Sequence, residues 1–273
     1  MELLWLVFLF LTLQPMVRQR YLMMMRRYKI AQLQGRRKSR VITLVHRQET
    51  MRFFGFPLMR YIDIDDSEEV TRAIYTTDPG VPIDIVLHTP GGLVLAAVQI
   101  ARAIQRHSGK VTVFVPHLAM SGGTLVALAA DEIVMCPHAM LGPIDPQVGG
   151  FPAASLMKVK AEKPIAEIDD QTLILADVGA KAMQQVARTT TELLRRQMGE
   201  DRAAAVAETL TSGKWTHDYP IDADEARGLG LKIGVDMPEE VLEMMQLYPQ
   251  PMTTAPTVEY LPKPARRVAG RPS

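Results

Sequence analysis

The stretch PHLAMSGGT, residues 116–124, decides how the chain around it folds. The β-branched run Val111 to Val115 before it predicts a buried strand, and the alanine-rich residues after Thr124 predict a helix. Ser121 is therefore expected at a strand-to-helix turn, where backbone N–H groups lack helical partners and carry partial positive charge. A serine at this point can attack a carbonyl whose oxyanion those groups stabilise, or it can simply cap the helix.

A second strand and turn of the same kind lie upstream. The apolar residues 83–87 lead into the glycine-rich turn HTPGG, residues 88–92, which a predicted helix follows. Because glycine lets the backbone approach a ligand closely, Gly91 or Gly92 is expected to join Gly122 in an oxyanion hole at one sheet edge. A tight turn alone is the simpler alternative. A phosphate cradle is another, although neither turn has the spacing or the lysine of a Walker loop.

Alternating strands and helices indicate an α/β fold with a mostly parallel sheet. We predict three segments: an apolar anchor with a basic juxtamembrane stretch at 1–39, a catalytic domain at 40–248, and a disordered proline-rich tail at 249–273. Within the catalytic domain, residues 149–170 are expected to form a loop, and residues 173–198 a helix.

The N-terminal segment is apolar and then basic. Residues 3–13 are almost wholly apolar, but this run is shorter than the about 20 residues of a full bilayer span. Residues 18–40 hold nine basic and no acidic residues, which favours the cytoplasmic side of a membrane and contact with anionic lipid. We predict a single-pass membrane anchor, lipid contact through residues 2–40, and a cytoplasmic catalytic domain. Nucleic-acid binding is the alternative that we set aside, since the adjacent apolar run already explains the charge.

The two turns together carry a family resemblance. HTPGG, followed about thirty residues later by AMSGGTLVALAADEIVMCPHAMLGPIDP, resembles the Clp-proteolytic-subunit/crotonase superfamily. Within it the chain most resembles the serine dehydrogenase proteinase family, relatives of signal peptide peptidase A and of archaeal membrane-associated serine peptidases. The likeness covers roughly residues 40–245. It implies the Clp/crotonase spiral fold, Ser121 as the nucleophile of a serine peptidase, and a homo-oligomer.

The resemblance leaves the general base open. The Clp subunit carries its catalytic histidine near the place of Asp145, and this chain has no histidine there, so a triad in the Clp manner is not supported. The archaeal relatives use a Ser–Lys dyad, and counting back from Gly199 by their spacing reaches Lys181. A lysine base must be neutral, which requires burial; an ordinary exposed lysine is the alternative.

A histidine and an acid offer other candidates for the base. Asp218 approximately matches the third triad residue of the Clp subunit, and His217 stands beside it. Either could orient or replace the base, and Lys214 is a third contender. The alternative is that His217 and Asp218 belong to a structural turn and have no catalytic role.

The sequence therefore predicts a membrane-anchored serine peptidase that cleaves peptide or protein substrates with Ser121 and Lys181. One alternative is a crotonase-like acyl-CoA enzyme that uses the same amides to hold an enolate. Another is a catalytically silent membrane scaffold. No metal or cofactor is expected, because the single Cys136 excludes a cysteine cluster and no ATPase motif is present. The net charge of +1 points to no polyanionic partner, so no nucleic acid is expected.

Overall fold

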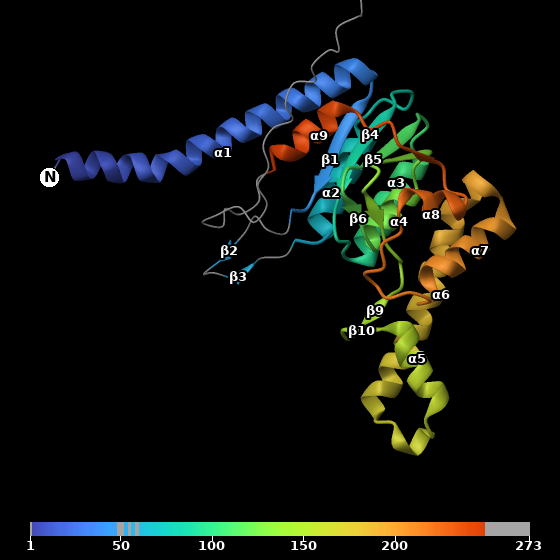
Figure 1. Ribbon diagram of the computed structural model, residues 1–273. Coiled ribbons are helices and arrows are strands. Elements are labelled where there is room, and N and C mark those ends of the chain that lie inside the picture. The colour runs from blue at the N-terminus through green and yellow to red at the C-terminus, as the bar shows by residue number, and fades with distance from the viewer. Residues whose placement is uncertain (1, 48–51, 54–55, 58–59, 249–273) are drawn as a thin grey trace, which may run out of the picture.

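The computed structural model describes residues 2–47, 52–53, 56–57 and 60–248. At its centre lies a sheet of five strands in the order β1-β4-β5-β7-β11 (Figure 1). These strands are β1 (Arg40–Val45), β4 (Ile83–His88), β5 (Val111–Val115), β7 (Glu132–Met135) and β11 (Ile233–Gly234). Every neighbouring pair runs parallel, which confirms the predicted α/β fold with a mostly parallel sheet.

Helices cover both faces of this sheet (Figure 1). They are α1 (Glu2–Arg37), α2 (Ile64–Tyr75), α3 (Val94–Arg106), α4 (Gly122–Leu128), α5 (Ala153–Glu162), α6 (Asp170–Met198), α7 (Glu200–Thr211), α8 (Ala223–Gly228) and α9 (Glu239–Gln246). Successive strand residues point to opposite faces, so Val113 joins the apolar layer shared with α2, α3, α4, α6, α7 and α8, and Phe114 joins the layer shared with α1 and α9. Burial on both faces explains why the strands are apolar throughout.

Short strand pairs bring further segments to the carboxyl edge of the sheet. β6 (Leu118–Ala119) pairs in parallel with β8 (Met140–Leu141), and an isolated bridge joins Leu141 to Ile221. The segments that contain residues 142–147 and 217 are thereby held near the turn that follows β5. Two antiparallel pairs complete the described strands: β2 (Arg52–Phe53) with β3 (Phe56–Pro57), and β9 (Gln147–Val148) with β10 (Phe151–Pro152).

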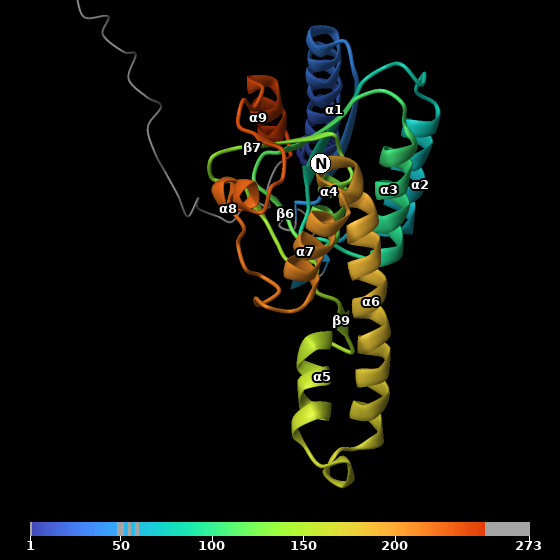
Figure 2. The ribbon, with the colours of Figure 1, turned by 90° about the vertical axis from the view of Figure 1, so that its right-hand side faces the viewer.

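The segment expected to be a loop, residues 149–170, is largely ordered structure, so that prediction is wrong. It contains β10, α5 and a 3₁₀ turn, Ile165–Glu167, and α5 packs against α6 in an arm that extends from the body (Figure 2). A methyl placed on Gly179 would lie 3.2 Å from the Cβ of Ala153, so the glycine permits a close helix contact. Packing against α6, which the local sequence does not predict, therefore stabilises α5.

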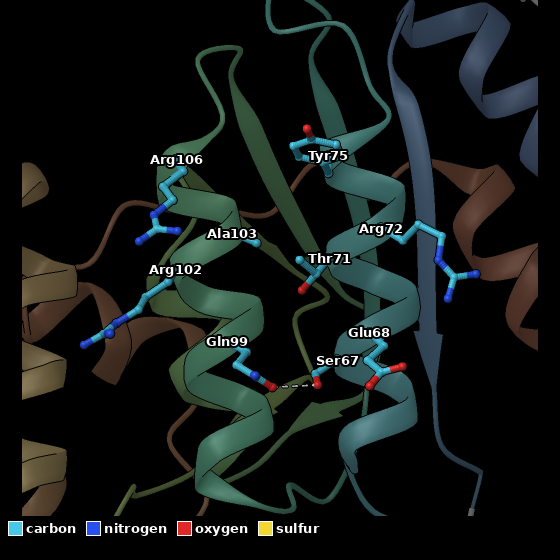
Figure 3. A pocket seen from close by; sticks show the side chains of 9 residues that line it. All are labelled: Ser67, Glu68, Thr71, Arg72, Tyr75, Gln99, Arg102, Ala103 and Arg106. Carbon is cyan, nitrogen blue, oxygen red and sulfur yellow. Dashed lines mark hydrogen bonds between the residues drawn. The ribbon is translucent and has the colours of Figure 1, made fainter.

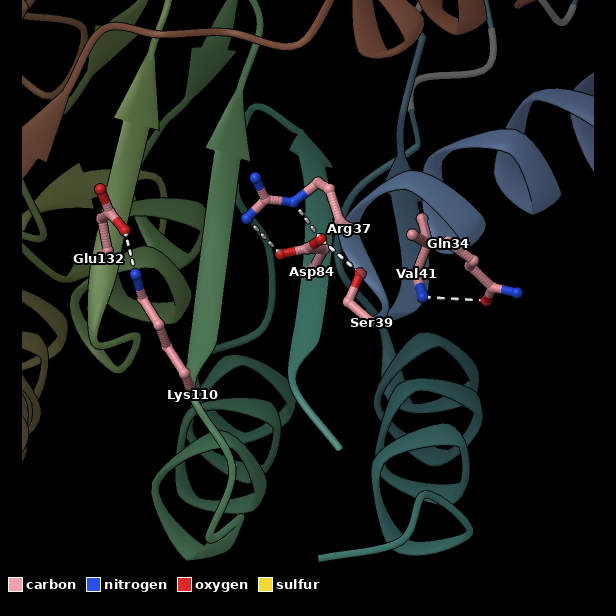
Figure 4. A network of polar contacts seen from close by, with 7 residues as sticks. All are labelled: Gln34, Arg37, Ser39, Val41, Asp84, Lys110 and Glu132. Atoms are coloured by element: carbon pink, nitrogen blue, oxygen red, sulfur yellow. Dashed lines mark hydrogen bonds and ion pairs between the residues drawn. The ribbon is translucent and has the colours of Figure 1, made fainter. Parts of the chain in front are cut away.

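A buried ion pair fastens the end of α1 to the sheet (Figure 4). Arg37 donates from Nε to Oδ2 of Asp84 at 2.5 Å and from Nη2 to Oδ1 at 3.2 Å, and Ser39 Oγ donates to the same carboxylate at 2.6 Å. Asp84 is only 1% exposed, so its charge depends on these donors. The Arg37 guanidinium also lies over the Phe114 ring, 4.9 Å from its centroid.

The N-terminal segment is one continuous helix rather than a short apolar run and a separate basic stretch. Two ion pairs tie α1 to α9, Lys29 with Glu243 at 2.5 Å and Arg36 with Glu240 at 2.7 Å. Within the described ranges, no helix combines the length and the apolar character needed to cross a membrane. The predicted disordered tail, residues 249–273, lies outside the described residues.

Candidate active site

The two glycine-rich turns lie against each other because β4 and β5 are neighbours in the sheet. Thr89 N–H donates to Leu118 O at 3.1 Å, and Met120 N–H donates to Thr89 O at 3.0 Å. A methyl placed on Gly91 would lie 2.8 Å from the Cβ of Ser121. Glycine is therefore required for so close an approach, and the expected meeting of the two turns is present.

Ser121 occupies a strained backbone position at the start of α4. Its φ of 50° and ψ of −117° lie outside the regions that a residue with a Cβ normally adopts. The side chain makes no capping hydrogen bond, so the helix-cap alternative does not describe it. Strain of this kind is typical of functional turns, and here it holds a half-buried hydroxyl at the edge of a cavity.

The backbone amides around Ser121 differ in what they bind. Gly91 N–H donates to Thr89 Oγ1 at 3.2 Å. Neither Gly92 N–H nor Gly122 N–H donates to any acceptor in the described part of the chain, and a methyl placed on Gly122 would lie 3.4 Å from Gly92 N. Of the three amides predicted from the sequence, those of Gly92 and Gly122 are the two available to an oxyanion.

A cavity of about 290 Å³ brings the candidate groups together. Ser121, Gly92, Gly122, Asp145 and His217 all line it, although they come from four separate stretches of the chain. The remaining wall is largely apolar, formed by Pro90, Val94, Leu125, Ile144 and Pro146 beside Tyr61 and Gln147. Such a cavity, apolar with a few convergent polar groups, is the usual form of a binding site.

His217 and Asp145 are in contact with each other in the wall of this cavity. His217 Nδ1 lies 2.8 Å from Asp145 Oδ1, Gln147 Nε2 donates to Asp145 Oδ2 at 2.7 Å, and Asp145 is 3% exposed. The hydrogen bond that His217 donates to the Asp145 carboxylate raises the pKa of His217, although burial opposes it. With Nδ1 bonded to the carboxylate, Nε2 is left to accept a proton.

Both residues of this pair were named from the sequence, but the sequence did not indicate that their side chains contact each other. A triad was set aside because an acid stands where the Clp subunit has its histidine. The sequence held one signal for this pair. Relative to the Clp subunit, the acid and the histidine have exchanged positions: Asp145 stands where that subunit has its histidine, and His217 stands beside the position of its acid. Only the fold shows that the two side chains meet, because 72 residues separate them.

Thr124, which the sequence did not indicate as functional, connects two segments near the cavity. Its Oγ1 lies 2.7 Å from Ala119 O and 2.8 Å from Gly142 O, and it accepts from Gly142 N–H at 3.0 Å. These contacts join the helix that begins after Ser121 to the turn that leads to Asp145. Thr124 therefore fixes the distance between the two halves of the cavity.

The other predicted base candidates lie elsewhere. Lys181 is on the exposed surface of α6 with 65% of its side chain accessible, and its Nζ lies 2.5 Å from Asp177 Oδ2. It does not line the Ser121 cavity within this chain, and its exposure does not provide the desolvation that a neutral lysine requires. Asp218 is exposed, and Lys214 is exposed with its ammonium 5.0 Å from the centroid of the Trp215 ring.

A larger cavity of about 630 Å³ lies between α2 and α3, away from Ser121 (Figure 3). Its serine, Ser67, is bonded to Gln99 Oε1 at 2.9 Å and to Ile64 O at 2.8 Å. No histidine lines this cavity, so its hydroxyl has no adjacent base to activate it. Of these two cavities, the smaller one brings together a serine, a histidine and the two open amides.

A serine in a strained turn, two open amides and a histidine–carboxylate pair are the parts of a serine hydrolase. Comparison with protein families matches residues 1–272 to the family described as ClpP-like SDH-type serine proteinase. The chain belongs to this family and is a serine peptidase, which confirms the family resemblance read from the sequence.

Several similar proteins align with most of this chain. The chain is 47% identical over 266 residues to the uncharacterized protein MJ0137 of Methanocaldococcus jannaschii, covering 97% of this chain and 93% of that protein. It is 45% identical over 265 residues to MJ1495 of the same organism, covering 97% and 90%. A solved mutant of the 1510-N membrane-bound stomatin-specific protease aligns at 21% identity and a TM-score of 0.49, over 75% of this chain and 82% of that one.

Proposed function

We propose that Ser121, His217 and Asp145 form the catalytic triad of this peptidase. In this mechanism Ser121 Oγ bonds to the scissile carbonyl carbon while His217 Nε2 takes its proton, and Gly92 and Gly122 N–H hold the oxyanion. His217 then gives the proton to the leaving amine, and water hydrolyses the acyl-enzyme. The observation that carries the proposal is the 2.8 Å contact of His217 Nδ1 with Asp145 Oδ1 in the cavity that Ser121 lines.

The substrate is proposed to be a peptide or protein. The apolar wall of the cavity and the absence of a cofactor requirement in this mechanism support hydrolysis of a peptide bond rather than acyl-CoA chemistry. The finer spiral fold named from the resemblance belongs to the same proposal, supported by the family description.

A Ser–Lys dyad with Lys181 is the alternative base, supported by spacing in the resemblance rather than by contact. Within one chain Lys181 pairs with Asp177 instead. This alternative requires α6 to carry Lys181 to a serine that it does not reach in the single chain.

Covalent labelling by a fluorophosphonate probe tests the nucleophile and separates the two bases. We expect wild type to label, Ser121→Ala to lose labelling, and His217→Ala to label at least a hundredfold more slowly, while Lys181→Ala labels at the wild-type rate. Normal labelling of His217→Ala with loss in Lys181→Ala would replace the triad by the dyad. No labelling of wild type would support the silent scaffold.

We also propose that α1 attaches the protein to a membrane. One face of α1 exposes apolar side chains at helical spacing: Leu13, Val17, Tyr21, Met24 and Tyr28. Basic residues flank this stripe, and residues 3–40 contain no acid to oppose anionic lipid. α9 contacts only the C-terminal part of α1, through Lys29 and Arg36 among others, and the exposed stripe supports binding along the membrane surface. The alternative, which the sequence predicts, is a single-pass span by residues 3–13 with the catalytic domain on the cytoplasmic side.

Self-association is the last part of the proposal. The α5–α6 arm exposes apolar side chains along its length: Phe151, Val159, Ile165, Ile174 and Val178. An exposed apolar surface on an extended arm supports packing against a second copy, as the family resemblance implies. Light scattering of the purified protein gives the number of subunits.

A further inference from the structure

Two buried polar side chains, with a partly exposed carboxylate beyond them, adjoin the glycine-rich turn at residues 88–92. Thr89 is 0% and His46 is 4% exposed. His46 Nδ1 lies 3.0 Å from Thr89 Oγ1, and its Nε2 lies 3.2 Å from Asp66 Oδ2. Thr89 Oγ1 in turn accepts from Gly91 N–H at 3.2 Å. These residues come from the end of β1, the turn after β4 and the first turn of α2, so three elements converge on one amide.

The hydrogen-bond partners determine which group in this chain of side chains donates and which accepts. The Asp66 carboxylate lies on the Nε2 side of His46, and the tautomer with its proton on Nε2 leaves Nδ1 as an acceptor. In that tautomer the hydroxyl of Thr89 donates to Nδ1 at 3.0 Å rather than to Gly91 O at 3.3 Å, and its oxygen accepts from Gly91 N–H. Each hydrogen bond in such a buried chain polarises the next, so the hydroxyl holds the Gly91 amide firmly.

This hold has a consequence for the two glycines of the turn. Gly91 N–H is bonded to Thr89, while its carbonyl accepts from Ile62 N–H at 2.7 Å. With both polar groups of Gly91 bound, the following peptide is fixed with Gly92 N–H free beside Gly122. Thr89 also bonds the Ser121 turn through its backbone, to Leu118 O and Met120 N–H. One residue therefore sets the relative position of both amides.

We propose that Thr89, His46 and Asp66 are positioning residues that set the oxyanion hole of the Ser121 site. They touch no substrate and act through the Gly91 peptide. The inference rests on the proposed function, since it concerns how that site stabilises the transition state. It predicts a selective loss: charge stabilisation in the transition state weakens, while binding of the ground-state peptide does not.

The decisive variants are Thr89→Val, which keeps the shape and removes the hydroxyl, and Thr89→Ser, which keeps the hydroxyl. We expect Thr89→Val to lower kcat at least tenfold with KM nearly unchanged, and Thr89→Ser to restore most of kcat. A peptide aldehyde, whose adduct with Ser121 places an oxyanion in the hole, should bind Thr89→Val more weakly by the same factor. Binding of the corresponding product peptide should not change.

Thr190→Val is the matched control, because Thr190 is 0% exposed and its hydroxyl has no hydrogen-bond partner. It should leave kcat and aldehyde affinity at wild-type values. If Thr89→Val does not fold, Asp66→Asn decides the question, since it removes the charge at the far end of the chain and should lower kcat alone by a smaller factor.

The two proposals fail in different ways. Ser121→Ala with full activity would end the proposed function itself. If Ser121 proves essential but both Thr89→Val and Asp66→Asn keep wild-type kcat and aldehyde affinity, only the positioning inference is overturned. Equal losses of kcat and of product-peptide binding would also overturn it, because they indicate general damage to the cavity.

Discussion

Ser121 has a backbone conformation that its own side chain disfavours. With φ at 50° and ψ at −117°, the residue is held by hydrogen bonds on either side, among them Gly123 N–H to Met120 O at 2.7 Å. The strain exposes the hydroxyl to the cavity at some expense of stability. The active-site residue is thus also a weak point of the fold.

Replacing Ser121 by glycine should therefore stabilise the protein while abolishing peptidase activity. We expect Ser121→Gly to unfold with a free energy about 1 kcal/mol higher than Ser121→Ala, because alanine keeps the Cβ that causes the strain. Chemical denaturation of both variants measures the difference. Ser212→Gly is the control: Ser212 has an ordinary φ of −74°, so no gain is expected there. Equal stabilities of Ser121→Gly and Ser121→Ala would show that the turn is unstrained.

The pair of His217 with Asp145 predicts the pH dependence of the peptidase. His217 must be neutral to accept a proton, so kcat/KM should rise with pH through its pKa, which Asp145 raises above the usual value. Asp145→Asn removes the main cause of that rise, so the midpoint should move to lower pH and the plateau should fall by about 10²–10⁴. Asp218→Asn, at an exposed neighbour, should move the midpoint far less. A pH–rate profile unchanged by Asp145→Asn would rule out His217 as the base.

At the scale of elements, the ion pair between Arg37 and Asp84 holds the C-terminal end of α1 against the sheet. Arg37 ends the helix, and Asp84 lies near the start of β4, nearly inaccessible to water. Like the contact between α5 and α6 at Gly179, this ion pair joins two segments whose contact no local sequence pattern predicts. The direction of α1 follows from it and from the two ion pairs with α9.

Removing only one partner of that ion pair should be costly. Arg37→Met leaves the Asp84 charge buried with Ser39 as its remaining partner, and we expect a loss of about 3 kcal/mol in the free energy of unfolding. Arg37→Met combined with Asp84→Leu should recover much of this loss, because no unpaired charge remains. Urea denaturation measures both. Arg72→Met, which removes an exposed pair with Glu69 at 3.1 Å, should change the free energy by less than about 1 kcal/mol.

At the scale of the whole molecule, two extensions leave a compact sheet domain. α1 extends to one side and the α5–α6 arm to another (Figures 1 and 2). Neither takes part in the Ser121 cavity, and both expose apolar side chains. This arrangement would separate the proposed membrane attachment and self-association from the proposed catalytic site.

Binding to lipid vesicles tests the role of α1. Wild type should float with vesicles that contain phosphatidylserine and bind neutral vesicles more weakly, since basic residues add electrostatic attraction. Tyr21→Asp and Met24→Asp place charges in the apolar stripe and should reduce flotation at least tenfold. Tyr75→Asp is the control, because Tyr75 is 88% exposed on α2, and it should float like wild type. Unchanged flotation of the stripe variants, with resistance to alkaline extraction, would favour a span by residues 3–13.

The sequence by itself determined the parallel α/β sheet, the two glycine-rich turns and the placement of Ser121, because continuous apolar runs and the glycine pairs that follow them carry that information. Only the tertiary structure decided the rest. It joined His217 to Asp145, turned Gly91 N–H toward Thr89, left Lys181 exposed and made a helical arm from residues predicted to be a loop. Each of these features depends on contacts between segments that are distant along the chain. A local sequence pattern does not specify which distant group will lie beside it.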